Sequence, residues 1–254
     1  LRRAEKQYKA YYDTDAISFK KEKLPREVDL SDVFDFKSIS ERCDQKNELP
    51  DGVYASEFDV GFLAFCFEGG RPGFIFIPGA LSVDQQCQWG RESLLNFPQP
   101  PNRTNHNVMY GPIPDLSIAA KEKKVWSTLG LQFNWSERNY NVALPHKKIP
   151  DALGQLAKRM AAPAMKISEE CQPEAAVVNY LGECDTLEGH LDDMEVDWSK
   201  PFVCMRSPRS CDAVLMAGEE RECFHGVHCV FTNEQYTEID NLKSCFSHED
   251  DACF

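Results

Sequence analysis

Four short segments decide the fold of this chain: AAVVNY at 175–180, TLEGHLDD at 186–193, AVLMAG at 213–218 and ECFH at 222–225. Apolar runs of four to six residues bounded by glycine and acidic residues are typical of buried strands. On an extended chain, residues i and i+2 lie on the same side, so His190 and Asp192 can converge on one point. A neighbouring strand brings a second imidazole, that of His225. Two histidines and one carboxylate can therefore meet at one metal ion.

The spacing of His190 and Asp192 is weak evidence by itself. The chain has 6 histidines and 41 acidic residues, and a second His-x-Asp match runs from His248 to Asp250 in an acidic tail. A surface loop therefore remains an alternative interpretation of the pair. The context favours a metal site, because one strand precedes the pair and another delivers His225. Two histidines and one carboxylate are the ligands that non-haem Fe(II) oxygenases use.

Several longer segments resemble the AlkB family of Fe(II)/2-oxoglutarate dioxygenases. The matching segments are VNY at 178–180, TLEGHLDDME at 186–195, DWSKP at 197–201, VLMAG at 214–218 and RECFHG at 221–226. The homologue-1 branch is resembled further by RPGFIFIP at 71–78, FPQPPNRTNH at 97–106 and WSTLGLQFNW at 126–135. This resemblance covers most of residues 1–250. It implies an α+β fold with a double-stranded β-helix (jelly-roll) core, and an oxidoreductase that demethylates N-alkylated bases of DNA or RNA.

The resemblance also assigns the site. It implies that His190, Asp192 and His225 bind Fe(II), with no catalytic residue beyond these metal ligands. Asn179, Tyr180 and Leu181 are expected to contact the cosubstrate 2-oxoglutarate. Leu181 stands where the family has an aromatic residue, so we expect one hydrogen bond to the cosubstrate to be lost.

The anchor for the far carboxylate of 2-oxoglutarate is not found in this chain. An arginine fork suits that carboxylate best, and the family places the arginine on a strand after the last histidine. Beyond Arg221 the sequence has no arginine and one lysine, Lys243. We therefore expect weak binding of the cosubstrate.

Segments of the core are also expected to be missing. The homologue-1 branch carries an insertion between Lys124 and Trp126, and the family has two further strands between Val203 and Asp212. Only 62 residues follow Asp192, whereas the family's core has six more strands after the first ligand strand. We predict an incomplete core and impaired activity.

Length and composition indicate one catalytic-size domain with an extension. With 254 residues, 42% of them hydrophobic, the chain can bury one substantial core. We predict an N-terminal helical extension over residues 1–70 and a truncated AlkB-like dioxygenase domain over residues 71–254. No run of eighteen apolar residues occurs, so no membrane contact is expected.

Charge and cysteine usage bear on partners and compartment. The net charge is −13, and residues 183–254 contribute −12 of it. Because carboxylates repel phosphates, a nucleic-acid substrate should contact the first two-thirds of the chain. Eleven scattered cysteines fit reduced thiols inside a cell, in the nucleus or cytoplasm. The sequence begins at Leu1, which leaves a mitochondrion open, and the oligomeric state is not predicted.

Local patterns predict two helices and one further strand. A helix should span residues 82–96, with a capping box between Ser82 and Gln85 and an apolar stripe formed by Val83, Cys87 and Leu94. Residues 129–135 alternate strictly as one strand, and residues 151–160 form an amphipathic helix. Residues 98–114 are a long polar loop, interpreted either as a substrate contact or as a connector.

Three functions remain open from the sequence. The first is an AlkB-like demethylase, and the second is a non-catalytic variant of that family that binds a metal or a partner. The third is a zinc protein that uses Cys223, His225, His228 and Cys229. Four ligands within seven residues would strain the backbone, which argues against a closed zinc site.

Overall fold

The computed structural model describes residues 49, 51–59, 62–67, 73–113, 116, 124–144, 146–180, 186–205, 213–218 and 225–228, with the backbone alone at 58, 59, 62, 186–189 and 225–228. Its elements, in chain order, are β1 (Val53–Asp59), β2 (Phe62–Phe67), β3 (Phe74–Ile77), α3 (Val83–Leu95), β4 (Arg103–Thr104), α4 (Asn105–Tyr110), β5 (Val125–Gly130), β6 (Gln132–Asn134), β7 (Asn139–Asn141), α6 (Asp151–Ala161), the 3-10 turn η1 (Ala162–Ala164), β8 (Ala175–Tyr180), β9 (Thr186–His190), β10 (Phe202–Met205), β11 (Ala213–Met216) and β12 (His225–His228). Every strand pairing among them is antiparallel, so the fold class is α+β.

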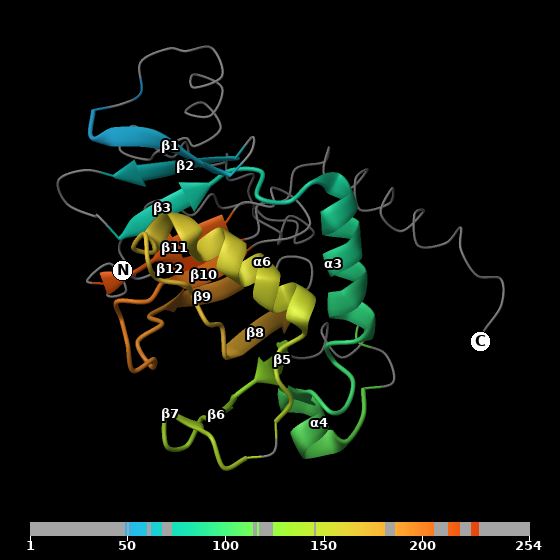
Figure 1. Ribbon diagram of the computed structural model, residues 1–254. Coiled ribbons are helices and arrows are strands. Elements are labelled where there is room, and N and C mark those ends of the chain that lie inside the picture. The colour runs from blue at the N-terminus through green and yellow to red at the C-terminus, as the bar shows by residue number, and fades with distance from the viewer. Residues whose placement is uncertain are drawn as a thin grey trace, which may run out of the picture.

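The largest sheet has five strands in the order β1-β2-β3-β11-β10 (Figure 1). Its core contains Phe65, Ile77 and Leu215, each fully buried. The strands β10 and β11 pair directly, from Phe202 opposite Met216 to Met205 opposite Ala213. The short connection between them therefore still allows a regular antiparallel ladder, although the family was expected to have two more strands at this point.

A second sheet has the strand order β4-β5-β8 and packs against α3. The ladder between β5 and β8 is continuous, with Val125 opposite Tyr180 at one end and Gly130 opposite Ala175 at the other. The strand predicted at 175–180 is thus confirmed with its bounds. One face of this sheet buries Leu129 among Phe97 and Ile149.

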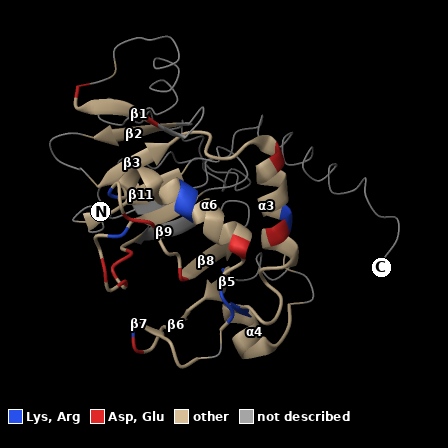
Figure 2. Cartoon of the chain, viewed as in Figure 1, with Lys and Arg blue, Asp and Glu red and all other residues tan. Residues whose placement is uncertain are grey.

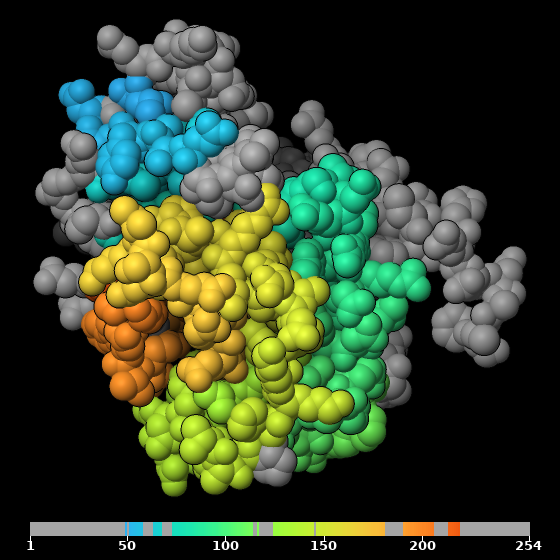
Figure 3. Space-filling model, in the orientation of Figure 1, coloured from blue at the N-terminus to red at the C-terminus, as the bar shows by residue number. Residues whose placement is uncertain are grey.

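Helix α6 joins the two sheets. Leu153 near its start packs with the second sheet, whereas Leu156 and Met160 pack against β3 and β11 of the first. In the space-filling view, α6 lies on the surface between α3 and the orange segment that includes β10 (Figure 3). The helix predicted at 151–160 is confirmed and ends one residue later, at Ala161.

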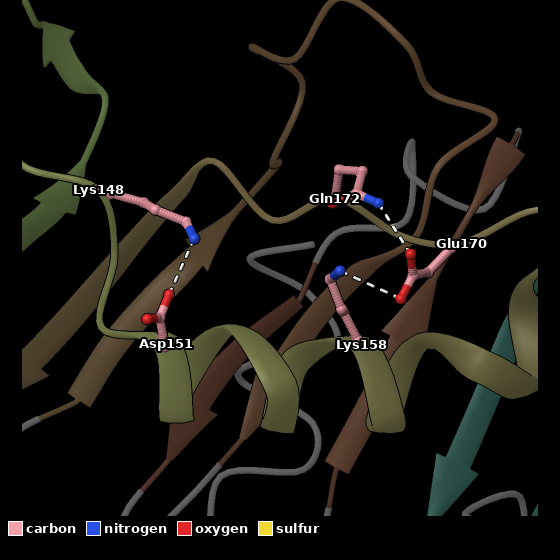
Figure 4. A network of polar contacts seen from close by, with 5 residues as sticks. All are labelled: Lys148, Asp151, Lys158, Glu170 and Gln172. Atoms are coloured by element: carbon pink, nitrogen blue, oxygen red, sulfur yellow. Dashed lines mark hydrogen bonds and ion pairs between the residues drawn. The ribbon is translucent and has the colours of Figure 1, made fainter.

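Polar contacts on the outside of α6 involve both of its ends. The Lys148 ammonium lies 2.8 Å from the Asp151 carboxylate, where the helix begins. Lys158 lies 3.1 Å from Glu170, which also accepts a hydrogen bond from the Gln172 amide at 3.0 Å (Figure 4). Exposed pairs of this kind stabilise a fold by less than about 1 kcal/mol each, so burial of the apolar face is what holds α6.

Helix α3 confirms one local prediction and corrects another. The capping box is present, because Ser82 Oγ accepts from the Gln85 amide while the Gln85 side chain accepts from the Ser82 amide. The predicted apolar stripe is wrong: Val83 and Leu94 are 71% and 48% exposed, and Cys87 is only half-buried. The helix instead packs through Trp89, so the inward face is rotated away from the predicted one.

Two further predictions need correction. Residues 98–114 are not one loop, because they contain β4 and α4, with a capping box between Thr104 and Asn107. The predicted strand at 129–135 is two strands: β5 ends at Gly130, which has a φ of 75°, and the Leu131 amide donates to the Glu174 carbonyl at 2.9 Å. Beyond this break the alternation no longer predicts burial, since Gln132 is buried and Trp135 is exposed.

The predicted extension and domain meet in one sheet. Strands β1 and β2 lie within the extension predicted at 1–70, and sequence reasoning missed both. Yet β2 pairs with β3, so Phe65 lies opposite Phe76 across the predicted boundary. The helix-like run near the N-terminus lies outside the described residues. Among the helices that the structure describes, none is long and apolar enough to cross a membrane.

Candidate metal centre

The two-stranded ladder of β9 and β12 brings the predicted metal ligands together. His225 is the register partner of His190, and directly opposed positions on antiparallel strands lie on the same face with Cβ atoms about 5 Å apart. The ladder shifts register between His225 and Val227. Such bulges are frequent beside active sites, where they redirect a side chain. The two histidine positions are 35 residues apart in sequence, and the register alone makes them neighbours.

The carboxylate follows directly. Asp192 is two residues beyond His190, at the start of the segment 191–201 that connects β9 to β10, here called the Asp192 loop. The Asp192 Oδ2 atom lies 4.0 Å from His190 Nε2, and the two side chains are 25% and 35% exposed. This partial exposure leaves room for a ligand to approach. No group of three or more ligating side chains is found among the residues whose side chains are described. His225 is not among those residues, because only its backbone is described.

The thiol of Cys204 also lies near Asp192. Burial raises the pKa of the Cys204 thiol on β10, and the negative charge of nearby Asp192 raises it further. Cys204 is therefore a protonated thiol beside the candidate ligands at neutral pH. Sequence reasoning missed Cys204, because the closeness of its thiol to Asp192 is seen only in the folded chain.

The charge of the Asp192 loop is strongly negative. It carries Asp192, Asp193, Glu195 and Asp197, and these acidic residues follow β9 (Figure 2). Asp197 is fixed by Ser199, whose amide and hydroxyl donate to its carboxylate at 3.0 and 2.6 Å. These hydrogen bonds lower the pKa of Asp197. A concentration of carboxylates favours a cation over a phosphate at this point.

The predicted cosubstrate residues separate onto two faces of β8. Tyr180 is buried, its hydroxyl donates to the Ser93 carbonyl at 2.7 Å, and Ser127 Oγ lies 3.1 Å from the same hydroxyl. Burial raises the pKa of Tyr180 to about 12. Asn179 is exposed on the opposite face, as the strand period of two requires. Asn179 is thus available to a ligand, whereas the Tyr180 side chain is used by the scaffold. Leu181 lies outside the described residues.

Next to Asn179 stands an aromatic row that reaches the Asp192 loop. Trp126 is the register partner of Asn179, and its ring contacts that of Trp135 at 5.5 Å. Trp135 contacts Phe133 at 4.8 Å, and Phe133 contacts Tyr140 at 5.2 Å. The strands β6 and β7, with the turn between them, form a hairpin over residues 132–141, here called the aromatic hairpin.

Of the four residues of the zinc hypothesis, the structure describes only the backbone of His225 and His228. His225 and His228 are three positions apart on β12, which places them on opposite faces of the strand. Cys223 and Cys229 lie outside the described residues, as do Arg221 and Lys243. The strand geometry therefore disfavours one zinc ion shared by both histidines.

Comparison with known proteins identifies relatives of the whole chain. A family model described as the 2OG-Fe(II) oxygenase superfamily matches residues 73–205, a range that includes His190 and Asp192. The chain is 48% identical to the DNA N(6)-methyladenine demethylase ALKBH1A of Arabidopsis thaliana, across 98% of this chain and 89% of the relative. It is 30% identical to the nucleic acid dioxygenase ALKBH1 of Homo sapiens, across 60% and 43%. It is 26% identical to the tRNA demethylase abh1 of Schizosaccharomyces pombe, across 44% of each.

The alignment with the Arabidopsis relative also measures what this chain lacks. It extends over 310 positions, which exceeds the 254 residues of the chain by 56. At least 56 aligned positions of the relative therefore have no counterpart here. This agrees with the expectation that internal segments are missing.

Proposed function

Because the chain belongs to the 2OG-Fe(II) oxygenase superfamily, we propose that it removes N-methyl groups oxidatively from bases of DNA or RNA. The main support is the 48% identity to a relative named as a DNA N(6)-methyladenine demethylase. A second relative is named as a tRNA demethylase. Single-stranded nucleic acid is the preferred substrate form, since a base must leave the duplex stack to enter a protein site.

The observation that carries the proposal is the pairing of His190 with His225, with Asp192 4.0 Å from the His190 imidazole. We assign these three residues as the ligands of Fe(II). This donor set fits the ion, since two imidazoles and one carboxylate on one side leave the other side open for cosubstrate and oxygen. When bound, iron with 2-oxoglutarate and O2 oxidises the methyl carbon, and the products are succinate, CO2, formaldehyde and the free base.

The antiparallel sheets are assigned to an incomplete double-stranded β-helix. The ladder of β9 and β12 forms one wall of the proposed core, and the pair of β10 and β11 belongs to the other. The family's fold supports this assignment. A domain that begins before residue 71 is favoured, because β2 pairs with β3.

On the side of the cosubstrate, we assign Asn179 as the contact from β8. Its neighbour Trp126 shares the same face of the sheet. At least 56 aligned positions of the Arabidopsis relative have no counterpart in this chain, so 2-oxoglutarate should bind weakly and activity should be impaired. A variant that binds metal without turning over is the second candidate function, and these missing positions are the observation that favours it.

The substrate is proposed to approach over the aromatic hairpin and α4. Trp135 is 62% exposed, and Tyr110 at the end of α4 is 61% exposed, and exposed aromatic rings can stack on bases. Arg103 and Lys124 are exposed near α4, in the part of the chain that lacks the acidic excess. Figure 2 shows basic residues where β5 and α4 lie together. Phosphate contacts are therefore expected there.

The test measures formaldehyde and the demethylated base from single-stranded DNA carrying N6-methyladenine and from methylated tRNA. The full chain is supplied with Fe(II), 2-oxoglutarate and ascorbate. His190→Ala should abolish turnover, while the matched control His146→Ala, at an exposed histidine, should not. Turnover that persists in His190→Ala, or without 2-oxoglutarate, would contradict the proposal.

If the wild type shows no turnover, calorimetry decides between the non-catalytic variant and the zinc protein. Metal binding that depends on His190, together with weak or absent 2-oxoglutarate binding, supports the non-catalytic variant. Metal binding that depends on Cys223 and Cys229 but not on His190 supports the zinc protein instead.

A further inference from the structure

The aromatic hairpin contacts three successive residues of the Asp192 loop. The Tyr140 hydroxyl donates a hydrogen bond to the Glu195 carboxylate at 3.3 Å. The Arg138 guanidinium lies 3.9 Å from the Asp193 carboxylate and 3.8 Å from the Met194 sulfur. These partners are about 55 residues apart in sequence. They begin at the residue after Asp192.

Asp192 lies outside the backbone ladder of β9 and β12. Strand β9 ends at His190, so the carboxylate stands beyond the last residue that backbone pairing fixes. None of the residues 190–201 belongs to a buried core cluster. Asp192 contacts His190 at 4.0 Å, and polar contacts hold the loop that follows it. The contacts to the hairpin begin at the next residue, Asp193.

The hairpin is rigid enough to serve this purpose. Its three aromatic rings stack edge to face in a row, and Trp126 on β5 continues the row into the second sheet. Edge-to-face pairs stabilise an element beyond the burial of their rings. Arg138 is the one described residue other than glycine with positive φ, at 53°. A positive φ at a bulky residue carries strain that surrounding contacts must hold.

We propose that the aromatic hairpin positions Asp192 for metal binding, with Tyr140 as the main positioning residue and Arg138 as a weaker one. This inference rests on the proposed function, because it takes Asp192 as a ligand. The hydrogen bond from Tyr140 to a carboxylate is charge-assisted and directional, whereas Arg138 and Asp193 form a largely exposed pair that contributes little. The same hairpin exposes Trp135, so substrate contact and metal geometry share one element.

The test measures the affinity of the full chain for Mn(II) alone, using the electron paramagnetic resonance signal of the free ion. Tyr140→Phe should weaken binding about fivefold, a smaller loss than the 10- to 100-fold typical for partners that touch a ligand directly. Tyr54→Phe, a matched change at an exposed tyrosine of β1, should leave the affinity unchanged. Arg138→Gln should weaken binding less than twofold, with Arg91→Gln on α3 as its control.

A double-mutant cycle separates positioning from a general loss of structure. Glu195→Ala removes the acceptor from the loop side, so the pair Tyr140→Phe and Glu195→Ala should weaken binding no more than either change alone. Melting temperatures should stay within a few degrees of the wild type. Additive losses, or full affinity in Tyr140→Phe, would overturn the inference while metal binding by the wild type still stood. If Tyr140→Phe does not fold, Glu195→Ala alone tests the same contact.

The reference variant is His190→Ala, which should lose Mn(II) binding altogether. If the wild type binds no Mn(II), both the metal centre and the positioning inference fail together. If His190→Ala loses binding and Tyr140→Phe does not, only the positioning inference fails.

Discussion

The five-stranded sheet and the β9–β12 ladder hold their residues by different means. In the sheet, Phe65, Ile77 and Leu215 are fully buried, and Ile77 and Leu215 pack with α6. At the candidate metal centre, His190 and Asp192 are 35% and 25% exposed. Their placement depends on strand register and on a few polar contacts. Burial stabilises the first region by about 25 cal/mol for each Å² of apolar surface removed from water, whereas the second gains little from it.

The residues that bind a ligand and the residues that stabilise the fold therefore lie in different regions of this chain. A protein region that binds a ligand keeps polar groups partly exposed and loosely packed, at some loss of stability. Changes in the sheet should therefore unfold the chain without altering the chemistry of the site. Changes at the ladder and the Asp192 loop should alter metal binding with little effect on the free energy of unfolding. Four predictions test this separation, from the largest expected effect on the free energy of unfolding to the smallest.

Leu215→Ala should have the largest effect. Leu215 is fully buried at the centre of the sheet, between β3 and β10, and truncation leaves a cavity there. A loss of about 3 kcal/mol in the free energy of unfolding is expected, measured by urea denaturation. Folded Leu215→Ala protein at low temperature should still bind Mn(II) with wild-type affinity. A loss of affinity in the folded protein would show that the two regions are coupled.

Gly130→Ala tests the break between β5 and β6. A Cβ atom at this position would lie 2.1 Å from the Glu174 carbonyl oxygen and 2.7 Å from Ile149 Cγ2, and the backbone has a φ of 75°. The positive φ and the clash together should cost about 2–3 kcal/mol. Gly90→Ala is the control, because a Cβ atom there meets nothing within 4 Å. An equal effect of both variants on thermal melting would contradict the account of the break.

Tyr180→Phe should have an intermediate effect that depends on pH. Near neutral pH it leaves the Ser93 carbonyl without its donor, at about 1–2 kcal/mol. Because the pKa of Tyr180 is raised to about 12 in the fold from about 10 in an unfolded chain, only the unfolded state loses the proton between these values. The wild type should therefore lose stability as pH rises from 10 to 12, and Tyr180→Phe should lose less. Parallel curves for the two proteins would argue against a buried, neutral phenol.

The sequence predicted helices α3 and α6, and the reason is local. The capping box of Ser82 and the apolar spacing of α6 depend on residues three or four positions apart, so a pattern shows them directly. The face of α3 was wrong because Val83 and Leu94 are apolar yet face outward. Which side of a helix is buried depends on partners elsewhere in the chain, and in α3 the large Trp89 side chain packs inward instead.

For the candidate site, the sequence supplied residue types and spacing but not the surroundings. The pattern of His190 and Asp192 suggested convergence, and the apolar run before His225 suggested a second strand for the other imidazole. The contact of Tyr140 with Glu195 and the closeness of Cys204 to Asp192 were not predicted. Side-chain contacts between separate strands leave no periodic signal in a sequence.

Asp192→Asn should have the smallest effect on stability and a large one on the metal. Asn keeps the shape of the side chain and removes one negative charge from a loop that also carries Asp193 and Glu195. Exposed or half-exposed charge interactions contribute little, so the free energy of unfolding should change by less than about 0.5 kcal/mol.

The Mn(II) affinity of Asp192→Asn should fall at least tenfold, because a neutral amide is a much weaker ligand than a carboxylate for a divalent ion. The control is Asp151→Asn on α6, at an exposed carboxylate that pairs with Lys148 (Figure 4), and there the affinity should not change. A large destabilisation by Asp192→Asn with unchanged affinity would reverse the comparison, since the carboxylate would then hold the fold instead of the metal.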